Sequence, residues 1–525
     1  MKNINRLFTY IITPSVFVLF LIACNKDIVE ADANWNALTP SKLDTAAGNW
    51  KPCVITAGDV FNIPAPEAVN SSAYQKELVD VKAAVANQTA EQQAAIKYWS
   101  AGTILRWNEI MRALVAKYNL APQDSAGVYP IPSAANPFAY PQFPFSNPPY
   151  AARSYAYISV AQYDALVAAY KLKQQYRRPA PYKTDASITP SVLKSDLYSF
   201  PSEEAVIATT TFEVMKNLFP TEVAFLTAKA EECRRFKYWA GATTASDIAA
   251  GDTLGKQIAA KIMARARTDN MGAAVGNQAK WDSLANRPTL LRTVDGKETS
   301  VADKSWFSEE SPKRPPMLPF YGNVKAWLFT NAAAIRVAAP PLTTAPEIQS
   351  QITELYNITS NLTREQMAIA HFWADGTGTQ TPPGHWNAIA CQYLQPLQMS
   401  EIRMARNLSL LNMAMMDAAI TCWDIKTTYS YPRPSNLDKR IKTITGLPNF
   451  PGYTSGHSTF SGAAATFLSY LLPSEKGTFD KMAKDASVSR QYGGIHLRID
   501  CEVGLVSGNK IGELAVSRAR TDGAD

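Results

Sequence analysis

The chain has 525 residues, of which 46% are hydrophobic and 18% are charged. This composition is typical of a globular protein and excludes a largely disordered chain. The formal net charge is +7, and no long run of Lys or Arg occurs, so we expect no nucleic-acid partner.

The N-terminus predicts a targeting segment. A short basic start, residues 1–6, is followed by an apolar run at 7–23 that contains Pro14 and is short for a membrane-spanning helix. The run ends at Leu21-Ile-Ala-Cys24, which resembles a bacterial lipobox. We therefore expect a signal peptide at 1–23 and a lipid anchor on Cys24, in the envelope of a Gram-negative bacterium, at the outer membrane and facing the periplasm or the cell surface. The alternative is a plain secretory signal with an incidental cysteine.

The rest of the chain predicts helices. Residues 24–70 are expected to form a lipidated tether and an irregular lead-in. A helical N-terminal half is expected at 71–345, with a Pro-rich loop at 129–150, and a C-terminal helical bundle at 346–525. Helices of the bundle are expected at 347–374, 386–395, 401–427, 458–472, 476–490 and 497–519. Alternation typical of strands is scarce, so the predicted fold class is all-α. No repeat near a 34-residue period is found.

Three short segments concentrate the chemistry of the chain. They are Lys426 to Arg433-Pro434, Thr454-Ser455-Gly456-His457, and Ser489-Arg490 followed by His496. Three cations, a hydroxyl, a glycine amide and two imidazoles suit a tetrahedral or trigonal-bipyramidal oxyanion. The middle segment precedes an apolar stretch, so the anion is expected to rest at a helix N-terminus.

Together these segments resemble the signature of the vanadium haloperoxidase and type 2 phosphatidic acid phosphatase (PAP2) superfamily, and most closely its chloroperoxidase-like bacterial branch. The signature reads K-x6-RP, PSGH and SR-x5-H, and Thr454 departs from it at the usual Pro. The resemblance implies helical bundles of that type. It implies a vanadate cofactor, in a site that phosphate can also occupy, with its equatorial oxygens bound by Lys426, Arg433, Ser455, Gly456 and Arg490. His496 would coordinate vanadium, and His457 would act as the acid–base group.

Further residues are assigned supporting roles. Asp500 follows His496 by four residues, so we expect both on one helix face, with the carboxylate orienting the imidazole. The resemblance implies that Trp423 and Phe450 lie beside a halide site and that Asp375 pairs with Arg490. The alternative for the two aromatics is ordinary core packing. The remaining histidines, His371 and His385, are expected to have structural or supporting roles.

Three functions follow from this pattern. The main hypothesis is a vanadium-dependent haloperoxidase that oxidises halide with hydrogen peroxide. The first alternative is an acid phosphatase that acts on a phosphate ester, with attack by His496 on phosphorus and protonation of the leaving group by His457. The second is a glycan-binding surface lipoprotein without enzymatic activity, suggested by 11 Trp and 23 Tyr.

Overall fold

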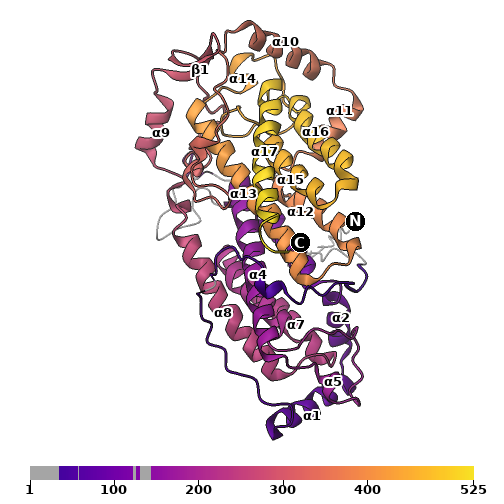
Figure 1. The fold of residues 1–525 in the computed structure, drawn as a ribbon. Coiled ribbons are helices and arrows are strands. Elements are labelled where there is room, and N and C mark those ends of the chain that lie inside the picture. The colour runs from indigo at the N-terminus through magenta and orange to yellow at the C-terminus, as the bar shows by residue number, and fades with distance from the viewer. Residues whose placement is uncertain (1–34, 57, 122–123, 125, 130–143, 525) are drawn as a thin grey trace, which may run out of the picture.

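The computed structural model describes residues 35–56, 58–121, 124, 126–129 and 144–524. The expected signal peptide, the expected lipidation at Cys24 and residues 130–143 of the expected Pro-rich loop lie outside them. Within the described residues, regular structure is almost entirely helical (Figure 1), which confirms the predicted all-α fold class. None of their helices is both long and apolar enough to cross a membrane.

The N-terminal helices gather at one end of the molecule (Figure 1). They are α1 (Ser72–Ala86), α2 (Ala90–Trp99), α3 (Thr103–Tyr118), α4 (Pro148–Tyr176), α5 (Pro181–Thr184), α6 (Glu203–Leu218), α7 (Val223–Trp239) and α8 (Ala245–Arg267). Several begin after a hydroxyl residue whose side chain accepts a hydrogen bond from a first-turn amide, as Ser202 does before α6 and Thr244 before α8. This satisfies one of the free N–H groups at a helix start.

A connecting region follows, with α9 (Gln278–Ala285) and an antiparallel hairpin of β1 (Leu290–Val294) and β2 (Lys297–Val301). The scarcity of strand patterns led us to expect no such element. The hairpin closes through Asp295 and Gly296, both with positive φ. An Asp-Gly pair between two short strands is a strong hairpin signal, because this tight turn requires φ above zero at both positions.

The C-terminal helices occupy the other end of the molecule (Figure 1). They are α10 (Pro346–Ser360), α11 (Arg364–Phe372), α12 (Thr381–Leu394), α13 (Glu401–Tyr429), α14 (Pro434–Leu437), α15 (Gly456–Leu471), α16 (Lys476–Tyr492) and α17 (Arg498–Ala519). The two longest helices, α4 and α13, pack against each other through the middle of the fold. Every residue of α13 from Met404 to Trp423 is buried, as expected for a helix surrounded by others.

The described chain contains an internal repeat. Helix α4 starts at Pro148 and α13 at Glu401, an offset of 253 residues that also separates the starts of α5 and α14, α6 and α15, α7 and α16, and α8 and α17. The five residues from Arg265 to Asp269 recur unchanged from Arg518 to Asp522. We call α4–α8 the first repeat and α13–α17 the second repeat.

Each repeat is stabilised by an ion pair within it, and the two ion pairs are at equivalent positions. In the first repeat Arg153 donates to the Asp269 carboxylate at 2.7 Å, and in the second Arg406 donates to Asp522 at 2.7 Å. Both pairs are buried. A buried ion pair is costly to break, because one partner alone leaves an uncompensated charge. The two repeats therefore share specific side-chain contacts as well as similar helix lengths.

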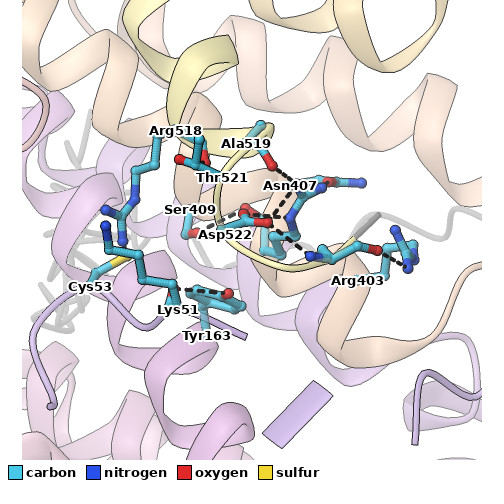
Figure 2. A network of polar contacts seen from close by, with 12 residues as sticks. Lys51, Cys53, Tyr163, Arg403, Asn407, Ser409, Arg518, Ala519, Thr521 and Asp522 are labelled. Atoms are coloured by element: carbon cyan, nitrogen blue, oxygen red, sulfur yellow. Dashed lines mark hydrogen bonds and ion pairs between the residues drawn. The ribbon is translucent and has the colours of Figure 1, made fainter. Parts of the chain in front are cut away.

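A strap without α-helix or β-strand precedes each repeat, at residues 47–56 and 321–330, and each strap begins with a short 3-10 helix. The Lys51 amide of the first strap donates to the Asp522 carbonyl at 2.7 Å, and the Lys325 amide of the second donates to the Asp269 carbonyl at 2.8 Å. Figure 2 shows Lys51 and Cys53 beside the end of the second repeat, where the Tyr163 hydroxyl donates to the Lys51 carbonyl at 3.2 Å. Each strap thus crosses to the end of the other repeat.

A buried aspartate fastens each strap to its own repeat. Asp164 of α4 accepts hydrogen bonds from the amides of residues 53–55 at 2.7 to 3.0 Å. Asp417 of α13, its equivalent, accepts from the amides of Trp327 and Leu328 at 2.7 to 3.0 Å. Burial raises the pKa of Asp164 to about 6 and that of Asp417 to about 7.

Candidate active site

The three predicted segments meet in the second repeat, where the ends of its helices converge. Lys426 lies in the last turn of α13, Arg433 directly precedes α14, Ser455 to His457 lie at the start of α15, Arg490 lies in the last turn of α16, and His496 lies between α16 and α17. The side chain of His457 is 17% exposed, whereas the other residues named here are buried. Buried polar groups need partners, so the donors of this site must be satisfied internally or by a ligand.

Two cations share one wall of the site. The Lys426 ammonium donates to the carbonyls of residues 451 and 452 at 2.7 and 2.9 Å. The Arg433 guanidinium donates through Nε to the Phe450 carbonyl at 2.9 Å and through Nη1 to the Ile495 carbonyl at 2.8 Å. Burial lowers the pKa of Lys426 to about 7 and that of Arg433 to about 10. In both cases removal from water disfavours the charged form, which a bound anion would favour.

Arg490 and the start of α15 complete the donor set of the site. We call Lys426, Arg433, Ser455, Gly456 and Arg490 the cradle. Arg490 donates to the Ser489 hydroxyl at 2.9 Å and to the Ala370 carbonyl at 3.1 Å, and burial lowers its pKa to about 10. Ser455 is the N-cap of α15, and its hydroxyl oxygen accepts from the Ser458 amide at 3.3 Å. Its O–H proton remains available to a ligand, next to a helix end that favours negative charge.

His496 is held in a defined tautomer. Its Nδ1 lies 3.0 Å from Asp500 Oδ2, and its Nε2 lies 3.0 Å from Arg433 Nη1. Because a guanidinium only donates, Nε2 must be the acceptor and Nδ1 must carry the proton. The lone pair is therefore on Nε2, the atom needed to coordinate a metal or attack phosphorus, and it would have to leave Arg433 Nη1 to do either.

The predicted contact of His496 with Asp500 occurs, but not on a shared helix face. Helix α17 begins at Arg498, two residues after His496. Asp500 instead reaches back across the helix start, where it accepts from the Leu497 amide at 3.1 Å as well as from His496. Burial raises the pKa of Asp500 to about 7.

His457 belongs to a chain of side chains that the sequence did not predict. Its Nε2 lies 3.7 Å from Asp375 Oδ2, and Asp375 Oδ1 lies 3.0 Å from His385 Nδ1. Among the described residues, the expected pair of Asp375 and Arg490 makes no direct salt bridge; burial lowers the pKa of Arg490 and the Asp375 charge partly offsets this, while both carboxylate oxygens face imidazoles. His385 stacks on Trp373 with ring centres 4.5 Å apart, which fixes its orientation.

The exposed fractions of the two imidazoles identify the open side of the site. The side chain of His457 is 17% exposed and that of His385 is 14% exposed, whereas the cradle residues are almost inaccessible. Burial and the nearby Arg490 lower the pKa of His457 well below its ordinary value. His371, the fourth histidine, is exposed at the end of α11. His385 was expected to have a supporting role, and its spacing alone could not indicate Asp375 as its partner.

The two aromatic residues expected near a halide lie against the cations. The Phe450 ring is 5.0 Å from the Lys426 ammonium and 4.9 Å from the Arg433 guanidinium, measured to the ring centre. Trp423 packs on Phe450 at 5.0 Å, faces Gly456, and donates from its indole N–H to the Met317 carbonyl at 2.9 Å. They form an apolar wall of the cradle and are also part of the core.

Unpaired polar atoms show that the site suits an oxyanion. Among the described residues, the buried site atoms without a hydrogen-bond partner include Arg433 Nη2, Asp500 Oδ1, and the facing pair His457 Nε2 and Asp375 Oδ2, which lie 3.7 Å apart. Arg433 Nη2 is a charged donor aimed at no acceptor, an arrangement that costs free energy unless an anion binds. The donor set, three cations with a serine hydroxyl and a helix N-terminus, is the set that vanadate or phosphate requires. These residues therefore fit the implied cofactor.

Comparisons with known proteins match the part of the chain that contains this site. Residues 407–518 match the family model of the PAP2 superfamily. A vanadium chloroperoxidase from Curvularia inaequalis is 23% identical over a stretch that covers 41% of this chain and 42% of that relative. The match thus spans less than half of the curated relative.

Among solved structures, a bacterial vanadium-dependent iodoperoxidase matches with a TM-score of 0.53 and 22% identity, over 71% of this chain and 91% of that one. This likeness shows the fold. The family match contains every motif residue from Lys426 to His496. The expected family resemblance is confirmed: the second repeat of this chain matches the model of the PAP2 superfamily over nearly its whole length.

Proposed function

We propose that the protein is a vanadium-dependent haloperoxidase, which oxidises halide with hydrogen peroxide. The observation that carries the proposal is the cradle of Lys426, Arg433 and Arg490, in which Arg433 Nη2 has no partner. Bound vanadate would supply a Lewis acid that activates peroxide toward halide. The three cations, Ser455 and the Gly456 amide would hold its oxygens, and His496 Nε2 would bind the metal.

The acid–base work falls to His457 on the open side. As it takes up a proton, its Nε2–H faces Asp375 Oδ2, and the carboxylate charge stabilises the imidazolium. His385 holds the other carboxylate oxygen through Nδ1. The 3.7 Å gap between His457 and Asp375 is longer than a hydrogen bond, and such contacts often tighten only when a ligand binds.

A phosphatase remains the second candidate, because the same lone pair on His496 Nε2 could attack phosphorus. Two observations favour the peroxidase. Phe450 and Trp423 give the cradle an apolar wall beside two cations, an environment suited to a weakly hydrated halide. Relatives matched by sequence and by fold are described as a chloroperoxidase and an iodoperoxidase.

A paired assay on the purified chain tests the proposal. One arm supplies orthovanadate, hydrogen peroxide and each halide in turn, and follows halogenation of a cyclic dione. The other omits vanadate and supplies an aryl phosphate. Vanadate-dependent halogenation that His496→Ala abolishes and His371→Ala preserves would support the peroxidase. Phosphate release without halogenation would replace it by the phosphatase.

We also propose that the chain is anchored in the bacterial envelope by a lipid on Cys24. The Leu21-Ile-Ala-Cys24 sequence supports this anchor. Metabolic labelling with a palmitate analogue, compared between the natural chain and Cys24→Ser, tests it. Equal labelling of both would contradict the proposal.

A further inference from the structure

The first repeat contains equivalents of three cradle positions and of Asp500. Moving back by the 253-residue offset from Lys426, Ser455, Arg490 and Asp500 leads to Lys173, Ser202, Lys237 and Asp247. Lysine, serine and aspartate are unchanged, and a lysine stands for the arginine. Two cations, a capping hydroxyl and a carboxylate are thus retained in a part of the chain that carries no family motif.

Main-chain contacts around these positions are the same in both repeats. Lys173 Nζ donates to the carbonyl of residue 198 at 2.5 Å, as Lys426 Nζ does to that of the equivalent residue 451 at 2.7 Å. The Ser202 amide donates to the Asp247 carbonyl at 3.0 Å, and the equivalent bond of the second repeat is 2.8 Å. The first repeat therefore preserves the geometry of the cradle.

The residues that would face a ligand differ. Ala180 stands at the position of Arg433, and Thr243 stands at that of His496. The Thr243 hydroxyl donates to Asp247 Oδ2 at 3.1 Å, so it keeps the hydrogen bond of the lost imidazole but offers no metal ligand. Most importantly, Glu203 and Glu204 stand where the second repeat has Gly456 and His457.

The Glu204 carboxylate occupies the retained donors. Its Oε2 accepts from the Ser202 hydroxyl at 3.2 Å, and its Oε1 forms an ion pair with Lys237. Lys237 also lies 3.3 Å from Glu203 Oε1. Ser202 and Lys237 are the equivalents of two groups that hold the oxyanion in the second repeat. Glu204 is 3% exposed, so this is a buried carboxylate bound by a preformed set of donors.

We propose that the first repeat contains a second oxyanion cradle, which the protein fills with its own Glu204 carboxylate. The proposal rests on the proposed function only in taking the second repeat as the reference cradle. The ligand class of the emptied site is a small monoanion such as formate, because two lysines and one hydroxyl replace the three cations, hydroxyl and imidazoles of the second repeat.

A cavity of about 820 Å³ gives access to this place. Its lining includes Lys173, Ala180, Glu203, Glu204 and Lys237. The buried Glu203 Oε2 has no hydrogen-bond partner among the described residues. An anion from solution could therefore reach Ser202 and Lys237 once the two carboxylates are removed.

The test is rescue by formate of the double variant Glu203→Gln, Glu204→Ala in the full chain. The variant should have a lower Tm than the natural chain, and formate should restore much of the loss because it binds only the folded state. Equilibrium dialysis with radiolabelled formate should show one more bound equivalent than the natural chain. Lys237→Met in the double variant should remove that equivalent alone.

Glu231→Ala is the matched control. It breaks ion pairs on α7, the helix of Lys237, at a side chain that is 41% exposed. Formate should not raise its Tm. A folded double variant with neither the extra equivalent nor formate-dependent stabilisation would overturn the proposal. If the double variant does not fold in formate, the single variant Glu204→Ala, which also empties the site, decides, and no formate-dependent rise in its Tm would overturn the proposal. A natural chain that binds no anion would refute the proposed function separately.

Discussion

Replacing Arg433 with lysine should weaken oxyanion binding while keeping the positive charge. In the structure Nε and Nη1 of Arg433 are committed to the carbonyls of Phe450 and Ile495, and only Nη2 is buried without a partner. A lysine ammonium cannot maintain these contacts and also reach the anion. The loss of one hydrogen bond to a charged group, about 1.5–3 kcal/mol, corresponds to a dissociation constant raised about 10- to 150-fold.

Titration calorimetry with orthovanadate and with phosphate measures this change directly. Arg440→Lys is the matched control, since its side chain is 68% exposed and pairs with Asp438 in solvent. The control should bind both anions as the natural chain does. If Arg433→Lys also binds both within about twofold of the natural affinity, a margin well below one charged hydrogen bond, the assignment of Nη2 as a ligand donor is wrong.

Three further predictions concern other parts of the molecule. His496→Ala should weaken orthovanadate more than phosphate in calorimetry, because only vanadium gains a bond from the imidazole, and an equal loss for both anions would refute this role. Asp375→Asn should lower the pKa of His457 further, because it removes the carboxylate 3.7 Å from Nε2; histidine-selective NMR, with exposed His371 as internal reference, would contradict this if the pKa is unchanged or higher. Burial raises the pKa of Asp417 to about 7, so the folded state binds this proton more tightly than the unfolded state, and stability should fall as pH rises from about 4 to about 7. Asp417→Asn should reduce that pH dependence in urea unfolding, and an identical slope would show that the shift does not contribute.

The helical class and the cradle could be anticipated from sequence for a physical reason. An oxyanion requires cations, a hydroxyl and close backbone approach, and few residue types supply these, so Lys426, Arg433, Ser455 and Arg490 were recognisable without coordinates. Which side chains pair with one another could not be predicted from the sequence. Asp375 could pair with a guanidinium or with imidazoles, and only the fold places His385 at 3.0 Å from it.

Two other features were missed for different reasons. The hairpin of β1 and β2 has only five residues in each strand, too few for a clear alternation, although Asp295-Gly296 carried the turn signal. The internal repeat escaped because its offset of 253 residues is far longer than a solenoid period and most equivalent positions differ. What survives of it is concentrated in contacts, such as Arg153 with Asp269, whose meaning appears only in three dimensions.

The crossed straps make the two repeats mutually dependent. The amide of Lys51 closes the end of the second repeat, and the amide of Lys325 closes the end of the first. A cut after residue 345 would leave both straps with the first repeat and neither with the second. We therefore expect residues 346–525, expressed alone, to lack a stable fold even though they contain the whole oxyanion motif, and co-expression with residues 35–345 to restore it. Catalysis in the second repeat would then depend on the strap at Lys51, 375 residues before the cradle residue Lys426, and any mutation that loosens that strap would act on the active site without contacting it.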